Sequence, residues 1–345
     1  MNIVVLAGGL SPERDVSLAS GARITAALRD FGHNAVLVDL FYGFDTLPVP
    51  VSAVFSSHTK IAPKSVSETA PDLDEVIKSR SKDVSGSIGK NVVELCMAAD
   101  LTFLALHGGD GENGRLQGFF DMLGIRYTGS GMFGCSLAMN KWASKQLLKS
   151  AGIPTPECTL LKESALRDLG DLTLPLIVKP CSGGSSIGIS IVRDEKELAA
   201  ALCEAFRYEP EVLLEAFIPG RELTCAVLGT QALPVIEIKP RGGFYDYAHK
   251  YQPGWTEDLV PAPIGAELTA AVQELSLRAF RALGLEIYAR FDFMLSPGGD
   301  LYCLEGNTLP GMTATSLVPQ AAAAANLDYA ALCDRIAQLS MEKYK

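Results

Sequence analysis

The sequence lacks a surplus of positive charge. Its 345 residues include 30 lysines and arginines against 40 aspartates and glutamates, for a net charge of −10. Proteins that bind nucleic acids or anionic membranes usually present basic surfaces, so neither kind of partner is expected. No apolar stretch approaches the length of a membrane span, and the N-terminus has no basic region followed by a long apolar core. We therefore expect neither a membrane protein nor a secretory signal peptide.

Paired cysteines and clustered histidines are also missing. The eight cysteines form no C-x-x-C pair, and the four histidines show no spacing typical of zinc ligands. Several cysteines lie in apolar runs, such as Cys225 in LTCAVLG and Cys303 in LYCLE. This pattern indicates reduced, mostly buried thiols in a cytoplasmic protein, and it disfavours a zinc site or a disulfide scaffold.

The length and the hydrophobic content of 48% suit two or three domains with sizeable cores. A buried strand at 2–7, a Gly-Gly turn, a helix over 17–32 and a strand at 34–40 predict a parallel, doubly wound sheet. Residues 46–90 are rich in Ser, Pro, Lys and Asp and predict a surface insertion in this first domain. Two further strands of the domain are expected at 100–106 and 125–128.

The rest of the chain alternates between strand and helix patterns without an internal repeat. A single helix is expected over 133–151, and a polar loop over 240–260. The other expected elements are strands at 175–179, 187–192, 211–215, 222–228 and 233–238, and helices at 194–208, 266–283 and 328–341.

A β-hairpin with converging carboxylates is predicted near the end of the chain. The apolar runs RFDFML and LYCLE flank a Pro-Gly-Gly turn at 297–299. Asp292 and Glu305 would lie on neighbouring strands, with Asn307 two residues further on. Three oxygen ligands of this kind suit a divalent cation such as Mg²⁺. The alternative is a hairpin whose carboxylates are simply solvated. The tight turn at 309–313 could face its backbone N–H groups toward an anion.

Two glycine-rich segments favour different interpretations, one as a phosphate-binding loop and the other as a packing site. Residues 179–188 place a lysine before a Gly/Ser loop between two strands, where backbone N–H groups can fold over phosphates. An ordinary flexible hairpin is the alternative. The segment GSGMFG at 129–134 matches G-x-G-x-x-G, but a loop stands where a dinucleotide fold needs an acidic residue at a strand end. Close packing at the start of a helix explains these glycines better.

Together these segments resemble the ATP-grasp enzymes, and most closely the D-alanine–D-alanine ligases, over nearly the whole chain. The resemblance implies a mixed α/β and α+β architecture of three parts. An N-terminal domain with a doubly wound parallel sheet would cover 1–128, and a small central α+β domain would cover 129–214. A larger C-terminal α+β domain with the metal site would cover 215–345.

The resemblance also implies a nucleotide site between the central and C-terminal domains. Lysines contact phosphates in that family, one glutamate accepts from the adenine amino group, and another holds the ribose. In VLLEAFIPGRELT at 212–224, two apolar residues would frame the adenine ring. The residues concerned are Lys141, Lys179 and Lys250 for the phosphates, Glu215 for the amino group, Phe217 and Ile218 for the ring, and Glu222 for the ribose.

Other matching segments imply the binding of two amino acids. In GGLSPERDVSLASG, Glu13 would hold the ammonium of the first substrate. In HGGDGENGRLQG, His107 would bound the carboxylate of that substrate, although Asn113 stands where the family usually has Asp. Ser316 and Leu317 match the segment that seats the carboxylate of the second substrate.

The segment FYDYAHKYQPGW at 244–255 resembles the mobile loop of these ligases. By resemblance, Tyr251 closes the site in a hydrogen-bonded set with Glu13 and Ser185. Arg290 and the backbone N–H of Gly311 would stabilise the oxyanion of a tetrahedral intermediate.

The implied function is the ATP-dependent ligation of two D-alanines through an acylphosphate, for peptidoglycan precursors. It implies ATP and Mg²⁺ or Mn²⁺ (two ions) as cofactors, D-alanine and ATP as small-molecule partners, and a homodimer. Two alternatives stay open: a ligase with D-serine or D-lactate as second substrate, and a nucleotide-binding relative without activity. A degraded relative should have lost a metal ligand, Arg290 or a lysine, and none is missing here.

Overall fold

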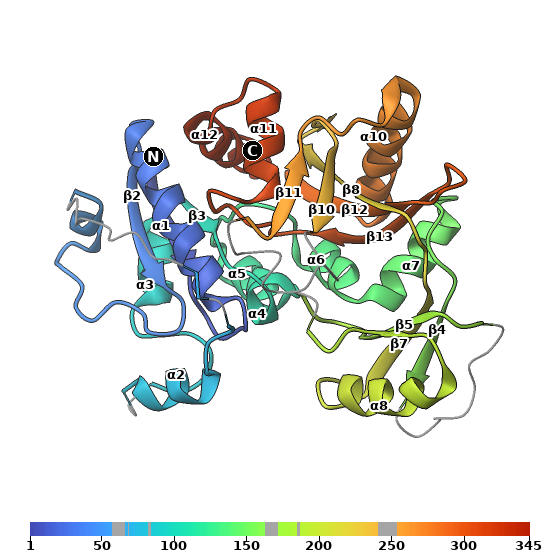
Figure 1. The fold of residues 1–345 in the computed structure, drawn as a ribbon. Coiled ribbons are helices and arrows are strands. Elements are labelled where there is room, and N and C mark those ends of the chain that lie inside the picture. The colour runs from blue at the N-terminus through green and yellow to red at the C-terminus, as the bar shows by residue number, and fades with distance from the viewer. Residues whose placement is uncertain (57–65, 68, 82–83, 163–171, 185–186, 241–253) are drawn as a thin grey trace.

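The computed structural model describes the chain except for residues 57–65, 68, 82–83, 163–171, 185–186 and 241–253. The predictions for Ser185, Lys250 and Tyr251 fall outside the described residues. Figure 1 shows three sheets along the chain, each with helices packed against it.

The first sheet is parallel, as its buried apolar strands predict. Strands β1 (Asn2–Ala7), β2 (Asn34–Asp39) and β3 (Leu101–Leu104) are ordered β2-β1-β3. Helix α1 (Arg14–Asp30) connects β1 to β2, and α3 (Val92–Ala98) precedes β3. The strand expected at 125–128 is only an isolated bridge between Thr102 and Tyr127.

The described part of the predicted insertion contains two short helices. A 3-10 helix, η1 (Val51–Ser56), buries Val54 and Phe55 against the first core. Helix α2 (Leu73–Ser79) begins at Asp72, whose carboxylate accepts from the backbone N–H groups of Asp74 and Glu75. The segment therefore contributes a few apolar side chains to the domain, beyond the surface role expected for it.

The prediction of a single helix over 133–151 is wrong, because the helix is interrupted at Asn140. The break separates α6 (Met132–Met139) from α7 (Lys141–Ser150). The Asn140 carboxamide oxygen accepts from the N–H of Ala143 at 2.9 Å, a side-chain cap that starts a new helix. Lys141 thereby becomes the first residue of α7. The preceding short helices are α4 (Gly109–Glu112) and α5 (Arg115–Leu123).

Gly134, in the first turn of α6, serves packing, as expected. A side chain at Gly134 would come within 2.7 Å of the carbonyl oxygen of Gly284. Helix α6 can therefore approach the neighbouring backbone only because this residue has no Cβ.

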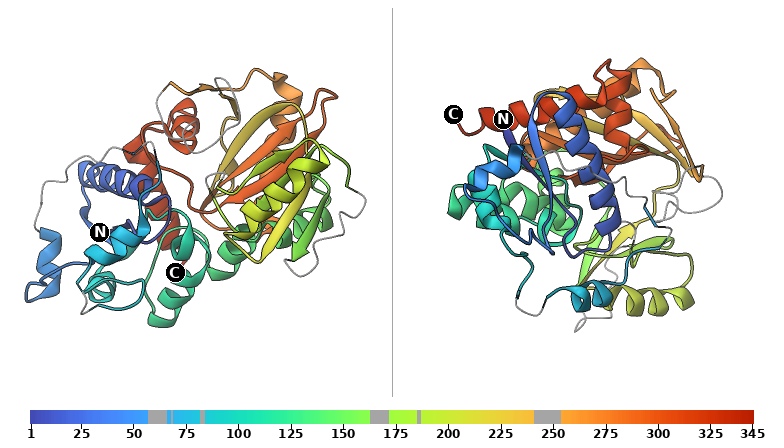
Figure 2. Two further views of the ribbon diagram at one scale, coloured as in Figure 1. Left: turned by 60° about the horizontal axis from the view of Figure 1, so that its bottom comes forward. Right: turned by 90° about the vertical axis from the view of Figure 1, so that its left-hand side faces the viewer.

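The second sheet is antiparallel, with the order β4-β7-β5-β6. Its strands are β4 (Cys158–Lys162), β5 (Leu176–Pro180), β6 (Ser190–Val192) and β7 (Glu211–Ala216), and α8 (Glu195–Phe206) packs against it. The sequence did not predict β4, which pairs with β7 at the edge of the sheet as described. Figure 2 shows α8 over this sheet.

The third sheet has six strands and carries the predicted hairpin. Its order is β11-β10-β8-β12-β13, with β9 paired to β8. The strands are β8 (Arg221–Leu228), β9 (Gln231–Ala232), β10 (Ile236–Pro240), β11 (Thr256–Leu259), β12 (Tyr288–Leu295) and β13 (Leu301–Asn307), and α10 (Gly265–Ala282) covers one face. Strand β11 lies in the stretch expected to be a polar loop, so that part of the prediction is wrong. The hairpin is confirmed: Asp292 pairs with Glu305 across β12 and β13.

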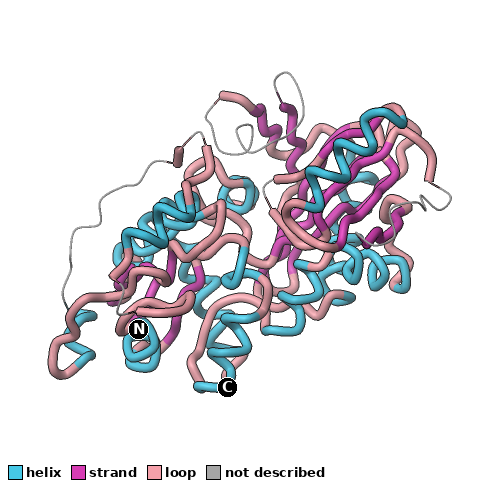
Figure 3. The backbone as a smooth tube through the Cα atoms, turned by 90° about the horizontal axis from the view of Figure 1, so that it is seen from below, coloured by secondary structure: helices cyan, strands magenta, loops and turns pink. Residues whose placement is uncertain are grey.

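The C-terminal helices join the first and third sheets. Side chains of α11 (Leu317–Ala324) and α12 (Tyr329–Glu342) share one core with the first sheet. His33, just before β2, forms a hydrogen bond with Asp334 on α12 at 2.7 Å. Figure 3 shows the first sheet on one side of the molecule and the strands of the other two sheets on the other. Helices α6 and α7 pack in the core of the third sheet, through Ala138 and Leu148.

Candidate active site

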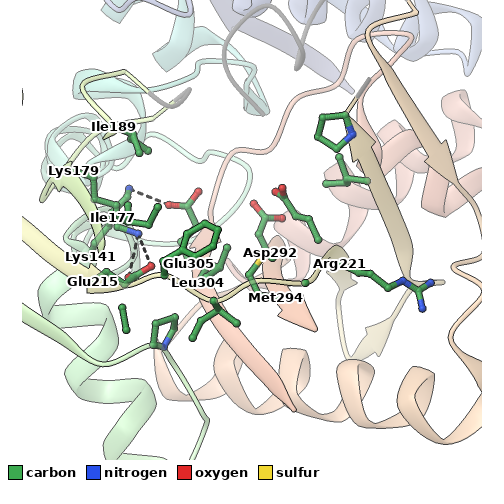
Figure 4. A pocket seen from close by; sticks show the side chains of 18 of the residues that line it. Lys141, Ile177, Lys179, Ile189, Glu215, Arg221, Asp292, Met294, Leu304 and Glu305 are labelled. Carbon is green, nitrogen blue, oxygen red and sulfur yellow. Dashed lines mark hydrogen bonds and ion pairs between the residues drawn. The ribbon is translucent and has the colours of Figure 1, made fainter. Parts of the chain in front are cut away.

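A cavity of about 640 Å³ lies between the second and third sheets (Figure 4). This volume is within the usual range for small-molecule sites. It is lined by strands of both sheets, by the connection between β7 and β8, and by the first residue of α7. The lining includes eight of the residues expected to bind nucleotide or metal, namely Lys141, Lys179, Glu215, Phe217, Ile218, Glu222, Asp292 and Glu305. The fold therefore brings these eight residues, which come from distant parts of the sequence, to one cavity.

One end of the cavity holds a buried group of charges. The Lys179 ammonium lies 3.1 Å from both carboxylate oxygens of Glu215, and the Lys145 ammonium lies 2.6 Å from one of them. Burial alone would raise the pKa of Glu215, but the two ammonium groups outweigh it and hold that pKa below its usual value. Burial lowers the pKa of Lys179, and the charge of Lys145 lowers it further, against the attraction of Glu215.

Lys145 is a site residue that the sequence interpretation missed. It lies four residues after Lys141, and this spacing puts both lysines on one face of a helix. That spacing was a usable signal. What it could not predict was the partner, because Glu215 lies on a strand 70 residues further along the chain.

Lys141 is held between the second and third sheets. Its ammonium lies 3.0 Å from Glu305 on β13 and donates to the carbonyl oxygen of Gly183 at 2.7 Å. Burial alone would lower the pKa of Lys141, but the Glu305 carboxylate outweighs it and raises that pKa. Gly183 belongs to the Gly/Ser loop predicted to cover phosphates, so the lysine lies where that loop and the carboxylate hairpin meet.

Asp292 accepts hydrogen bonds from three side chains. Arg290 donates to both of its oxygens, at 2.9 and 2.8 Å. Thr224 on β8 donates to one oxygen at 2.7 Å, and the Asn307 amide donates to the other at 3.1 Å. These four bonds fill the acceptor positions of a carboxylate. The predicted oxyanion residue Arg290 and two of the predicted metal ligands, Asp292 and Asn307, therefore belong to one hydrogen-bonded cluster.

The hairpin residues fit a hard divalent cation. Asp292 and Glu305 are in register on adjacent strands, and both line the cavity. Their oxygens, with the amide oxygen of Asn307, are the donors that Mg²⁺ prefers. A cation bound to Asp292 would take the place of one of the hydrogen-bond donors to its carboxylate. Asn307 could then offer its amide oxygen to the cation, since an amide carries both a donor NH₂ group and an oxygen. No cluster of three His, Cys, Asp or Glu residues occurs in the described ranges, so substrate oxygens and water would complete the coordination.

Glu13 lies where the first and second sheets approach each other. A Cβ built on Gly184, in the Gly/Ser loop, would be 2.9 Å from its carboxylate, and one on Gly108 would also be 2.9 Å away. Glu13 immediately precedes α1. Its predicted partner Ser185 follows Gly184 in sequence but lies outside the described residues.

His107 contacts the turn after β13. One ring nitrogen lies 2.8 Å from the carbonyl oxygen of Leu309, and the other lies 3.2 Å from the hydroxyl of Ser20, which accepts from the N–H of Met312. That His107 bounds a substrate carboxylate stays a prediction. Both ring nitrogens have protein partners here, and the cavity beside the ring measures only about 20 Å³.

Glu112 is a second residue that the interpretation missed. Its carboxylate accepts from the backbone N–H groups of Gly108 at 3.0 Å and Leu309 at 3.2 Å. Burial raises its pKa, and the nearby charge of Glu13 raises it further. Glu112 and His107 therefore fix the position of the turn from the N-terminal side.

The turn brings together the remaining predicted residues. A Cβ at Gly311 would come within 2.7 Å of the Ser316 hydroxyl, which accepts from the N–H of Thr313 at 2.9 Å. Leu317 is the first residue of α11. The N–H groups at the start of a helix favour an anion, so this end of α11 suits a carboxylate.

The family models match both halves of the chain. The model described as D-ala D-ala ligase N-terminus matches residues 2–130, and the one described as D-ala D-ala ligase C-terminus matches residues 147–338. The described helices include none that is both long and apolar enough to cross a membrane.

Curated relatives and solved structures agree with these matches. A D-alanine–D-alanine ligase of Pediococcus pentosaceus is 42% identical over 97% of this chain and 96% of its own length. One of Lacticaseibacillus casei is 39% identical over 100% and 97%. The crystal structure of a Bacillus anthracis D-alanine–D-alanine ligase complexed with ATP is similar, with a TM-score of 0.76, 32% identity and coverage of 100% and 99%.

Proposed function

Because the chain belongs to the D-alanine–D-alanine ligase family, we propose that it joins two D-alanine molecules in an ATP-dependent reaction. The reaction forms a carbon–nitrogen bond and releases ADP and phosphate. The observation that carries the proposal is the 640 Å³ cavity, which is lined by Lys141 and Lys179 together with the hairpin carboxylates Asp292 and Glu305. A peptidoglycan precursor would be the destination of the product, as in the rest of the family.

We assign ATP to this cavity. Phe217 and Ile218 supply an apolar surface for adenine, next to Glu215, which can accept from the amino group. Glu222, two residues past the connection, is placed for the ribose. Lys141 and Lys179 would meet the phosphates, with Lys250 joining them from the predicted mobile loop.

Asp292, Glu305 and Asn307 would hold Mg²⁺ or Mn²⁺, two ions in our proposal. When bound, the metal neutralises phosphate charge. The chain itself contributes three oxygen donors and keeps them in place: Arg290 and Thr224 fix Asp292, and strand pairing fixes Glu305 opposite it. Rigid donors of this kind need little rearrangement at the moment of reaction.

The reaction has two steps. A carboxylate oxygen of the first D-alanine forms a bond to the γ-phosphorus of ATP, and the bond to ADP breaks. The amine of the second D-alanine then attacks the carbonyl carbon of this acylphosphate, loses a proton, and phosphate leaves. Arg290 and the Gly311 N–H would stabilise the negative oxygen of the intermediate, and removing one such donor typically costs about 10²–10³ in rate.

The substrates would lie beside the turn at 309–316. Glu13 is proposed for the first ammonium, with Ser185 and Tyr251 completing a hydrogen-bonded set that closes the site. Ser316 and Leu317, at the start of α11, are proposed for the second carboxylate. For His107 the hydrogen bonds favour an indirect role: it holds the carbonyl of Leu309, and through that turn it fixes Gly311.

The test is ADP release by the purified protein with single amino and hydroxy acids, and with D-alanine paired with D-serine or D-lactate. We expect turnover that needs D-alanine and Mg²⁺ and that yields D-alanyl-D-alanine. The Lys179→Met variant serves as a control that should lose ATP binding. Formation of AMP and pyrophosphate would exclude the acylphosphate route. Binding of ATP without turnover on any substrate would favour a non-catalytic relative.

We also infer a homodimer in the cytoplasm. Exposed apolar side chains on the adjacent helices α5 and α6, including Met122 and Phe133, suit a contact between two copies. All eight cysteines are free, and burial raises the pKa of several thiols, which suits a reducing compartment. Phe133→Glu should lower the mass measured by light scattering, whereas Met97→Glu on α3 should leave it unchanged.

A further inference from the structure

Lys145 is a fully buried charge just outside the nucleotide cavity. Its side chain is 0% exposed, and it does not line the cavity. Its ammonium lies 2.6 Å from Glu215 and donates to the hydroxyl of Thr155 at 2.7 Å. A charge this deeply buried is costly unless it is paired, so Lys145 needs Glu215 and Glu215 needs a cation.

The two lysines assigned to phosphates are both paired with carboxylates in this structure. Lys179 is 3.1 Å from Glu215, and Lys141 is 3.0 Å from Glu305 (Figure 4). An ATP phosphate that attracts these lysines must therefore draw them away from the carboxylates. Each carboxylate would then need another cation, because an unpaired buried charge is strongly destabilising.

Glu305 and Glu215 differ in which cation would remain beside each of them once ATP has bound the lysines. Glu305 is a quarter exposed and would gain the metal ion that accompanies ATP. Glu215 is only 3% exposed, and in the described part of the chain its second cation is Lys145. Lys145 lies behind Glu215, out of the cavity, and its other partner is the protein's own Thr155. It can therefore stay in place when ATP binds.

We propose that Lys145 is the permanent counter-ion of Glu215, a positioning residue that allows Lys179 to transfer from Glu215 to an ATP phosphate. The inference rests on the proposed nucleotide site. With Lys145 in place, Glu215 remains ionised and oriented after Lys179 leaves it. Without Lys145, Glu215 retains Lys179, and ATP must compete with a buried ion pair.

The test is a double-mutant cycle on ATP affinity, measured by calorimetry in the presence of Mg²⁺. Lys145→Met is expected to weaken ATP binding by roughly 10- to 100-fold, because Lys179 can leave only at the cost of an unpaired buried carboxylate. In turnover assays the loss should fall on the KM for ATP rather than on kcat, because the chemistry does not use Lys145.

The second variant removes the competing charge. Lys145→Met combined with Glu215→Gln should bind ATP at least about fivefold more tightly than Lys145→Met alone, because Lys179 is then free of a carboxylate. A residue that merely supported the fold would show no such rescue. The matched control is Lys149→Met on the same helix, which removes an exposed lysine paired with Glu157 at 2.6 Å and should bind ATP like the wild type.

Each outcome is decisive. Wild-type affinity in Lys145→Met, or a double variant no tighter than the single one, overturns the inference while the nucleotide site stands. A wild-type protein that binds no ATP overturns the proposed function itself. If Lys145→Met does not fold, the comparison is between Glu215→Gln and the double variant. They should then bind ATP within about threefold of each other, and a tenfold gap would overturn the proposal.

Discussion

The hairpin carboxylates Asp292 and Glu305 can each be changed to the nearly isosteric amide. We expect the two variants to lose turnover to a similar extent but to lose different amounts of stability. Glu305→Gln removes a charge from a side chain that is 26% exposed and lies 3.0 Å from the Lys141 ammonium. Asp292→Asn removes a charge from a buried side chain that accepts four hydrogen bonds. Both changes should lower turnover by about 10²–10³-fold, because each removes a negative ligand from the metal that neutralises the phosphates.

The stability costs follow from the contacts. Glu305→Gln should cost about 1–2 kcal/mol in the free energy of unfolding, because the glutamine oxygen can still accept from the buried Lys141 ammonium but no longer carries a charge. In Asp292→Asn, one oxygen becomes an NH₂ group that faces the donors Arg290 and Asn307. Two hydrogen bonds are lost, one of them to a charged group, so the expected cost is about 2–4 kcal/mol.

Two assays separate these effects. ADP release is measured while Mg²⁺ is titrated, and both variants should need at least about tenfold more Mg²⁺ for half-maximal rate if each supplies a ligand. Urea unfolding gives the stabilities. Glu157→Gln, which neutralises an exposed carboxylate paired with Lys149, is the control and should behave like the wild type. A wild-type Mg²⁺ response in either hairpin variant would place the metal elsewhere. Equal stability losses would refute the hydrogen-bond argument.

Three further predictions concern other parts of the site. Arg290→Ala should lower kcat far more than it weakens ATP binding, because its role is in the intermediate; equal losses in kinetics and calorimetry would make it a binding or folding residue. The wild-type protein should lose stability as the pH falls from the usual glutamate pKa of about 4.3 through the lower folded pKa of Glu215, because its ionised form is the one stabilised in the fold. Glu215→Gln should flatten that decline in thermal unfolding curves, and an unchanged curve would contradict it. Tyr251→Phe should raise the share of D-lactate accepted in place of D-alanine, by product analysis; unchanged selectivity would leave the hydroxyl without a role in it.

Local patterns in the sequence determined much of the fold. The parallel first sheet and the hairpin of β12 and β13 were predictable, because buried strands and a Pro-Gly-Gly turn leave strong short-range signals. Eight of the residues that line the cavity were predictable too, since they lie in segments that resemble the ligase family. The signal was weaker where a short edge strand has little pattern of its own, which is why β4 and β11 were missed.

The charge pairs were decided only by the tertiary structure. Nothing near Lys145 in the sequence indicates that Glu215 will share its buried site, and nothing near His107 indicates the carbonyl of Leu309, 202 residues away. The break at Asn140 is local, but its consequence is not: it places Lys141 against Gly183, in the loop between β5 and β6, and against Glu305 on β13. The sequence by itself determined which residue types are present and most of the local helix and strand conformations that they adopt. Packing of the three sheets decided which charges meet, because a buried charge is tolerated only where the fold brings it an opposite one.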